Sequence, residues 1–118
     1  MKNLALLIPD QMGRVLKMDA EEIRVLFTDG VQSMRMNNYL PGPEHGFTTH
    51  SDADALTILF QLNQTEGLQI RRDGGWVPIK PQPNAFVVNI GDIMEVVSNG
   101  IHRSIEHREI VNSTRERI

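Results

Sequence analysis

The sequence has 118 residues, of which 40% are hydrophobic and 23% charged, so it has the composition of one soluble globular domain and not of a disordered chain. Its 12 basic and 15 acidic side chains leave a net charge of -3 without a basic cluster, which excludes the electrostatic surface of a nucleic-acid-binding protein. The absence of cysteine excludes a disulfide framework and favours a reducing compartment, so we expect a cytoplasmic protein.

The first thirty residues are predicted to be helical. Apolar residues recur at near-helical spacing from Leu4 to Leu16, and Pro9 is expected either to kink this helix or to occupy its first position. A second helix is expected to begin at Asp19, which can cap it together with Glu22, and to end near Asp29-Gly30.

The N-terminal apolar run from Leu4 to Ile8 is too short for a signal peptide, because Pro9-Asp10 ends it. No stretch approaches the roughly 20 apolar residues of a membrane-spanning helix. We therefore predict a soluble protein that does not contact a membrane.

From Val31 onward the hydrophobic period changes to two. Met34 and Met36 alternate with polar residues, which predicts a half-buried strand that continues to Tyr39. Pro41-Gly42-Pro43 then forces a loop. Further strands are predicted from short apolar runs between turn residues, at 56–62, 67–71, 76–79, 85–90 (fully buried), 96–98, from 101 onward, 105–111, and from 115 onward.

Two of the turns between these strands have the sequence of hairpin turns. Asp73-Gly74-Gly75 is expected to join 67–71 to 76–79, and Asn99-Gly100 is the dipeptide best suited to a two-residue hairpin turn. Two helices followed by many short strands indicate a mainly β, antiparallel double-sheet fold.

The candidate metal ligands are His50, Asp52 and His107. Residues two apart on a strand point to one face, so His50 and Asp52 can meet the same ion. His107 follows much later, on a predicted strand face that it shares with Ile105, Glu109 and Val111. Two imidazoles and one carboxylate on one face of a metal leave the other positions open for an oxidant and a co-substrate. Taken alone, His-x-Asp is a weak signal, and its ordinary alternative is a solvated loop before a strand.

Arg117 lies beyond His107 in a segment that is predicted to form a neighbouring strand. A guanidinium there can hold a carboxylate through two parallel hydrogen bonds, which lysine does less well. The alternative for Arg117 is a solvated charge.

The ordered pattern of His50-x-Asp52, His107 and Arg117 resembles that of the non-haem Fe(II) and 2-oxoglutarate-dependent oxygenases. The likeness runs through essentially the whole chain and is nearest to the plant branch that contains the senescence-related and codeine-demethylase-like enzymes. The other motifs that carry it are Met34-Arg35-Met36-Asn37-Asn38-Tyr39, Gly67-Leu68-Gln69-Ile70, Trp76-Val77-Pro78, Pro83-Asn84-Ala85-Phe86-Val87-Val88-Asn89-Ile90-Gly91-Asp92 and Ser98-Asn99-Gly100-Ile101.

This resemblance implies a fold, cofactors and an activity. The implied fold is a double-stranded β-helix (jelly roll) over residues 31–118, with residues 1–30 as a helical lead-in that packs on the sheet. His50, Asp52 and His107 match the family's iron ligands, and the residues that match its 2-oxoglutarate-binding positions are Arg117, Tyr39 and Asn37. The expected reaction uses O₂ to hydroxylate or O-demethylate a small plant metabolite with release of succinate and CO₂, and the full-length form is expected to be a monomer.

Three departures from the family pattern lead us to expect a sequence truncated at both ends. The sequence ends at Ile118, where the serine of the family's Arg-x-Ser motif should follow, and the family's large N-terminal region does not precede Met1. The loop from Tyr39 to His50 is also shorter than in the family. The alternative hypothesis is therefore a catalytically inactive jelly-roll remnant that binds metal weakly or not at all.

Four other polar or aromatic residues are weaker candidates. His45 is expected to be solvated, His102 to lie near the rim of the pocket, and Glu106 to point away from His107. Trp76 is expected to pack on a hairpin and not on a ligand.

Overall fold

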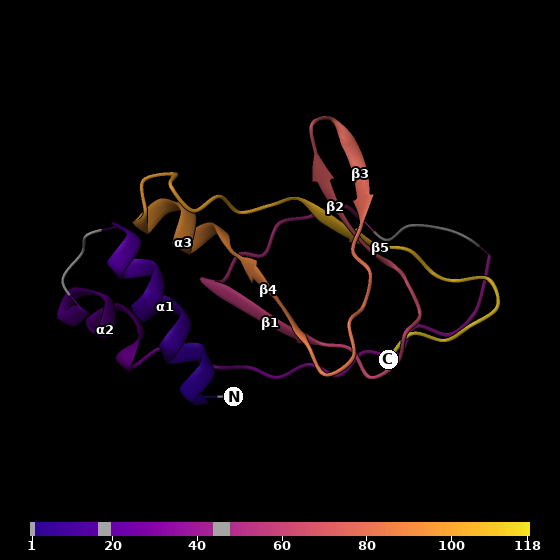
Figure 1. Cartoon of the computed structure of the whole chain (residues 1–118), viewed down its shortest axis with the longest axis horizontal. Helices are drawn as coiled ribbons and strands as arrows, with labels where there is room; N and C mark the ends of the chain where they lie inside the picture. Colours follow the sequence, from indigo (N-terminus) through magenta and orange to yellow (C-terminus); the bar gives the residue numbers. More distant parts are fainter. Residues whose placement is uncertain (1, 17–19, 44–47) are drawn as a thin grey trace. The chain divides into compact units, whose positions relative to one another are not determined.

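The computed structural model describes residues 2–16, 20–43 and 48–118, and the chain divides into two compact units, Met1–Arg35 and Met36–Ile118. The first unit is helical and the second contains all the strands (Figure 1). None of the helices in the described residues is both long and apolar enough to cross a lipid bilayer. The expected packing of the helical segment on the sheet stays a prediction.

The first unit holds the two helices that the sequence predicts, α1 (Lys2–Leu16) and α2 (Ala20–Thr28), which pack on each other. Pro9 is buried inside α1 and does not occupy its first position. The second helix ends as expected, and the amide of Gly30 donates to the carbonyl oxygen of Phe27 at 3.3 Å. The expected cap at Asp19 lies outside the described residues.

The strand predicted from Val31 to Tyr39 is wrong. Residues 31–38 have no regular secondary structure, and Met34 and Met36 are 88% and 87% exposed. Within the described residues, backbone pairing in this segment begins only at Tyr39, whose amide and carbonyl each bond to Arg117 at 2.9 Å. An alternating pattern becomes a half-buried strand only where a neighbouring strand pairs with it.

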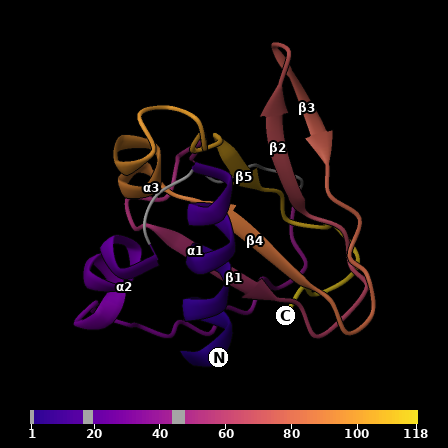
Figure 2. The same ribbon diagram turned by 60° about the vertical axis from the view of Figure 1, so that its left-hand side comes forward.

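Two small antiparallel sheets make up the second unit. One sheet pairs β1 (Leu56–Phe60) with β4 (Phe86–Ile90). The other contains β2 (Leu68–Arg72), β3 (Gly75–Pro78) and β5 (His107–Glu109), in the spatial order β3-β2-β5. Figure 2 shows β2 and β3 as a projecting hairpin.

The hairpin between β2 and β3 confirms the predicted turn. Asp73 and Gly74 have φ angles of 51° and 80°, and positive φ at both central residues is what a type I′ turn requires. The sequence Asp-Gly supplies that backbone conformation at low cost, since glycine has no Cβ.

The strand at 85–90 exists as β4, but the prediction that it is fully buried is wrong. Phe86 and Val88 are 44% and 37% exposed, whereas Asn89 is buried. One face of the β1-β4 sheet is therefore open in this unit, and on it the Phe60 and Phe86 rings pack with centroids 5.2 Å apart.

Asn99-Gly100 does not form the predicted hairpin turn. The preceding residues form α3 (Asp92–Val97), and the dipeptide ends this helix. The Gly100 amide donates to Glu95 O at 2.8 Å and the Asn99 amide to Val96 O at 3.0 Å, which is the Schellman pattern of a helix C-terminus. Asn99 and Gly100 have positive φ angles of 50° and 78°. Both a helix C-terminus and a two-residue hairpin turn use positive φ angles, so the dipeptide is compatible with either structure.

The last predicted strands are shorter than expected. The strand predicted at 105–111 is regular only over β5 (His107–Glu109), and the strand expected from Arg115 consists of the isolated bridge between Arg117 and Tyr39. Both segments nevertheless carry the predicted functional residues.

Candidate metal centre

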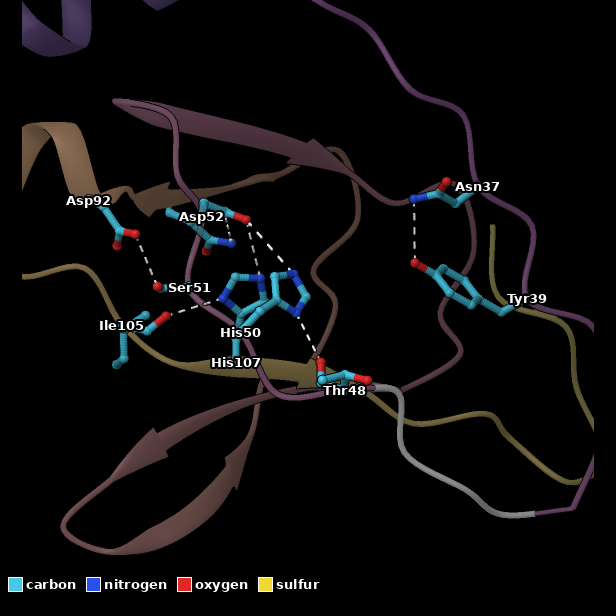
Figure 3. A network of polar contacts seen from close by, with 10 residues as sticks. Asn37, Tyr39, Thr48, His50, Ser51, Asp52, Asp92, Ile105 and His107 are labelled. Carbon is cyan, nitrogen blue, oxygen red and sulfur yellow. Dashed lines mark hydrogen bonds and ion pairs between the residues drawn. The ribbon is translucent and has the colours of Figure 1, made fainter.

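Three side chains that the sequence predicts to bind iron come together beside β5 (Figure 3). One ligand atom from each of His50, Asp52 and His107 lies within 4.8 Å of the other two. Asp52 Oδ1 is 4.0 Å from His50 Nε2 and 3.6 Å from His107 Nε2. These three residues form the metal cluster.

The main chain brings the two histidines together. His50 and His107 form an isolated antiparallel bridge, in which the His50 amide donates to His107 O at 3.1 Å and the His107 amide to His50 O at 2.9 Å. Residues directly opposed in this way present their side chains on one face, and the ring centroids are 4.5 Å apart. Asp52 returns to that face because it follows His50 by two residues.

Backbone carbonyls fix the tautomer of both histidines. His50 Nδ1 lies 3.0 Å from Thr48 O, and His107 Nδ1 lies 3.2 Å from Ile105 O (Figure 3). A carbonyl oxygen only accepts, so each Nδ1 carries a proton, and in the neutral ring Nε2 offers a lone pair. Both lone pairs thus face the Asp52 carboxylate. A cation is the group that fits between these three electron-pair donors, two imidazole nitrogens and one carboxylate oxygen.

The cluster is closed on one side and open on the other. His107 is only 4% exposed, whereas the His50 side chain is 48% exposed and that of Asp52 is 17% exposed. The buried histidine anchors the cluster to the interior, and the exposed side can admit exchangeable ligands.

Asp52 is held by residues in β4 and directly after it. Asn89 Nδ2 donates to Asp52 Oδ2 at 3.3 Å, which leaves Oδ1 free to face the histidines. The Asp92 amide donates to Asp52 O at 2.8 Å, and Ser51 Oγ donates to Asp92 Oδ2 at 3.2 Å. The outer hydrogen bonds of a metal ligand fix its direction.

Gly91 lets the chain pass against the backbone of the Asp52 segment. A Cβ at Gly91 would overlap the carbonyl group of Asp54 and would lie 2.9 Å from Asp52 O. The Gly91 amide donates to Ala55 O at 3.0 Å. In the sequence, Gly91-Asp92 marks only the end of a strand, because a close approach of two backbone segments leaves no local pattern.

Arg117, the predicted co-substrate residue, is a buried cation with an unused donor. It is 4% exposed, and its Nε donates to Gln61 Oε1 at 2.9 Å. Gln61 is itself fixed, since its Nε2 donates to Asn63 O at 2.7 Å and to Thr65 O at 2.6 Å. Arg117 Nη1 is buried and has no hydrogen-bond partner among the described residues. A buried guanidinium nitrogen without a partner fits a carboxylate.

Gly67 makes room for the Arg117 side chain. A Cβ at Gly67 would lie 3.0 Å from Arg117 Cδ and 2.7 Å from Ile110 O. The sequence alone does not indicate that Gly67 or Gln61 supports Arg117. The one unusual feature is that Gln61 is a polar residue at the end of an otherwise apolar predicted strand.

Tyr39 and Asn37 lie beside Arg117. The Arg117 Cζ atom is 5.2 Å from the centre of the Tyr39 ring, and Asn37 Nδ2 donates to the Tyr39 hydroxyl at 3.4 Å (Figure 3). Burial raises the pKa of the Tyr39 hydroxyl, the carboxylate of Glu109 raises it further, and Arg117 acts in the opposite direction. Tyr39 therefore stays protonated and is a hydrogen-bond donor at neutral pH. Arg117, Tyr39, Asn37 and Gln61 form the arginine site.

The weaker candidates that the structure describes, His102, Glu106 and Trp76, lie outside both groups. His45 falls outside the described residues, and His102 is tied to the end of α3 through its backbone, with its amide bonded to Ser98 Oγ at 3.0 Å. Glu106 is 3.7 Å from Arg71 and largely exposed, as expected. The Trp76 ring on β3 contacts the guanidinium of Arg71 on β2 at 5.6 Å and that of Arg108 on β5 at 4.1 Å, so it packs on the sheet that contains the hairpin.

Known proteins with similar sequences are enzymes of one family. The family model of the 2OG-Fe(II) oxygenase superfamily matches residues 30–118. The chain is 52% identical to Protein SRG1 of Arabidopsis thaliana, over 99% of this chain and 34% of that protein. It is 50% identical to codeine O-demethylase of Papaver somniferum, over 100% of this chain and 34% of that protein. The chain thus spans about a third of the length of these curated relatives.

Solved structures give the same result. A crystal structure of JOX2 in complex with 2OG, Fe and JA superposes with a TM-score of 0.83 at 33% identity, over 98% of this chain and 36% of that one. The fold is therefore the jelly roll of these oxygenases, which confirms the fold class predicted from the sequence. The chain belongs to the 2OG-Fe(II) oxygenase superfamily.

Proposed function

We propose that this chain is the iron- and co-substrate-binding part of a 2-oxoglutarate-dependent dioxygenase, with His50, Asp52 and His107 as the Fe(II) ligands. The observation that carries the proposal is the cluster geometry. Three ligand atoms lie within 4.8 Å of one another, and both histidines are fixed by backbone carbonyls in the tautomer that points Nε2 at Asp52. Two imidazoles and one carboxylate are the ligand set of non-haem iron oxygenases.

At the arginine site, Arg117, Tyr39 and Asn37 are proposed to bind the distal carboxylate of 2-oxoglutarate. The free Nη1 of Arg117 supplies a charge-assisted hydrogen bond in a buried setting, where such bonds are strongest. The Tyr39 hydroxyl supplies a second, neutral donor, and Asn37 steadies it through the bond at 3.4 Å. The chain's role in this account is to bind and orient.

When bound, Fe(II) with 2-oxoglutarate and O₂ supplies an oxidation that hydroxylates a C–H bond and yields succinate and CO₂. If the hydroxylated carbon is an O-methyl group, the product collapses to an alcohol or phenol and formaldehyde. The metal cluster leaves its exposed side, next to His50, for the exchangeable ligands and the substrate.

The proposed substrate is a small plant specialised metabolite, and O-demethylation is supported by the 50% identity to codeine O-demethylase. That relative does not favour the alternative of an inactive remnant. A cytoplasmic location, supported by the cysteine-free sequence, and a monomeric state complete the proposal.

An anaerobic titration with Fe(II) and 2-oxoglutarate tests the proposed ligands. The wild-type chain should develop the weak visible charge-transfer band of an iron-chelated 2-oxo acid. His50→Ala and Asp52→Ala should each abolish the band and weaken Fe(II) binding by about 100-fold or more, because each removes one of three ligands. His102→Ala is the matched control, since His102 lies outside the cluster. Unchanged Fe(II) affinity in Asp52→Ala would refute the ligand assignment.

A further inference from the structure

The main chain on both sides of Arg117 is fixed by the segment that follows β1. The Leu62 amide donates to Ile118 O at 2.7 Å, and Asn63 Nδ2 donates to Glu116 O at 3.0 Å. These two acceptors belong to the residues directly after and directly before Arg117. The backbone from which the arginine projects is therefore tied to one short segment of the chain.

The same segment fixes the Arg117 side chain through Gln61. Gln61 Oε1 accepts a hydrogen bond from Arg117 Nε at 2.9 Å. Its Nε2 donates to Asn63 O at 2.7 Å and to Thr65 O at 2.6 Å, which uses both N–H groups of the amide. Turning the amide over would place Oε1 against two carbonyl oxygens, so its present orientation is the stable one.

The two carbonyl groups that hold Gln61 lie in a turn with its own support. Thr65 is buried, and its amide donates to Asn63 Oδ1 at 3.3 Å. A bond from an asparagine side chain to the amide two residues later is typical of an Asx turn. The position of the Gln61 oxygen is thus set by local structure that exists before any ligand binds.

The contact with Gln61 decides which edge of the guanidinium a ligand can use. A carboxylate binds a guanidinium through two N–H groups, either side-on through Nε and one Nη atom or end-on through both Nη atoms. Gln61 occupies Nε, so the side-on mode is blocked. Arg117 Nη1 is buried and finds no hydrogen-bond partner in the part of the chain that the structure describes, so the end-on mode is open.

Gln61 orients the guanidinium without reducing its charge. An amide oxygen is a neutral acceptor, whereas a carboxylate in the same place would offset the positive charge that attracts the ligand. Because Arg117 is buried, that charge acts strongly on a nearby carboxylate. A side chain that is already ordered also spares the ligand the entropy loss of ordering it.

We propose that Gln61 is a positioning residue of the arginine site, which turns the Nη end of Arg117 towards the ligand and so favours 2-oxo acids with a distal carboxylate. This inference rests on the proposed function, because it takes the arginine site as the place where the distal carboxylate binds. Gln61 acts through Arg117 and does not itself contact the ligand.

The test compares two ligands that differ only at the distal end. Iron-loaded protein is titrated calorimetrically, without oxygen, with 2-oxoglutarate and with 2-oxopentanoate, which has a methyl group in place of the distal carboxylate. Gln61→Met keeps the length of the side chain and removes the amide. The Kd for 2-oxoglutarate should rise about fivefold or more, and that for 2-oxopentanoate should change by less than about twofold. A general structural defect would instead raise both Kd values.

Gln69→Met is the matched control. Gln69 Oε1 accepts an equivalent hydrogen bond from Arg108 Nε at 3.0 Å, outside the arginine site. This variant removes the same kind of amide–guanidinium contact, and it should leave the Kd of both ligands unchanged.

Two further variants separate positioning from other effects. Gln61→Glu keeps an acceptor oxygen opposite Arg117 Nε but adds a negative charge, so it should raise the Kd for 2-oxoglutarate by more than Gln61→Met does. In an Arg117→Leu background, Gln61→Met should have no further effect on the Kd of either ligand, since its effect passes through the arginine.

Three results would overturn the inference: an unchanged ratio of the two Kd values in Gln61→Met, equal weakening of both ligands, or a further loss in the Arg117→Leu background. If Gln61→Met does not fold, as judged by circular dichroism, Gln61→Glu decides, and an unchanged Kd for 2-oxoglutarate there refutes the inference. If the wild type binds both ligands with equal affinity, the proposed function of the arginine site fails. A wild-type preference that persists in both Gln61 variants refutes the inference alone.

Discussion

The metal cluster and the arginine site are positioned by different parts of the polypeptide. In the metal cluster, main-chain groups fix most of the geometry: His50 and His107 pair through their backbones, and carbonyl oxygens orient both rings. In the arginine site, side chains fix the geometry: Gln61 accepts a hydrogen bond from Arg117, and Asn37 donates one to the Tyr39 hydroxyl. A substitution that leaves the backbone in place can therefore change ligand binding at the arginine site. Iron binding at the metal cluster is instead sensitive to movements of the backbone.

The largest expected effect comes from a substitution that disrupts the main-chain support of the metal cluster. Gly91→Ala places a Cβ against the carbonyl group of Asp54, so the segment that carries Asp52 must move. We expect Fe(II) affinity to fall about 100-fold and the free energy of unfolding to fall by about 3 kcal/mol, measured by anaerobic metal titration and by denaturant melts.

Gly74→Ala is the control for backbone strain. Gly74 also has a positive φ, 80°, but a Cβ there would meet no atom within 4 Å. It should cost about 1 kcal/mol of stability and leave Fe(II) affinity unchanged. Equal effects of the two variants on iron binding would contradict the role given to Gly91.

The next largest expected effect is confined to the arginine site and changes 2-oxoglutarate binding without changing Fe(II) binding. Arg117→Leu removes the buried cation, and we expect the Kd for 2-oxoglutarate to rise by at least about tenfold, since a charge-assisted pair contributes roughly 1.5–3 kcal/mol. Fe(II) affinity without 2-oxoglutarate should be unchanged, because no main-chain group of the metal cluster is altered. Arg115→Leu, at an exposed arginine two residues earlier, is the matched control. A parallel loss of Fe(II) affinity in Arg117→Leu would mean that the two regions are not separable.

The smallest effect concerns Tyr39. Because its hydroxyl is a neutral hydrogen-bond donor, to which Asn37 donates at 3.4 Å, Tyr39→Phe should raise the Kd for 2-oxoglutarate only about two- to threefold. Calorimetry of the wild type and the variant measures this change directly. A loss as large as that in Arg117→Leu would contradict the smaller role given to Tyr39.

The metal cluster could be predicted from the sequence because its geometry follows from simple periodicity. His-x-Asp on an extended segment places two ligands on one face, and the family pattern supplies His107 and Arg117. Gly91 and Gly67 could not be assigned in this way, since what matters at each is the close approach of a distant backbone or side chain.

The errors in the fold arose where one local signal fits two structures. Asn99-Gly100 offers the positive φ that both a hairpin turn and a helix C-terminus need, and the six residues of α3 are too few to show a helical period. The alternation at Met34 and Met36 predicts a strand, but strand formation depends on a pairing partner, and that is a property of the tertiary structure.

A crystal structure of the Fe(II)-loaded protein, grown without oxygen, tests the central claim most directly. The account predicts one iron ion bonded to Nε2 of His50, Nε2 of His107 and a carboxylate oxygen of Asp52, each at about 2.0–2.2 Å, the range usual for imidazole and carboxylate ligands of a divalent first-row metal. Iron at another position, or bound through Nδ1 of either histidine, would contradict it.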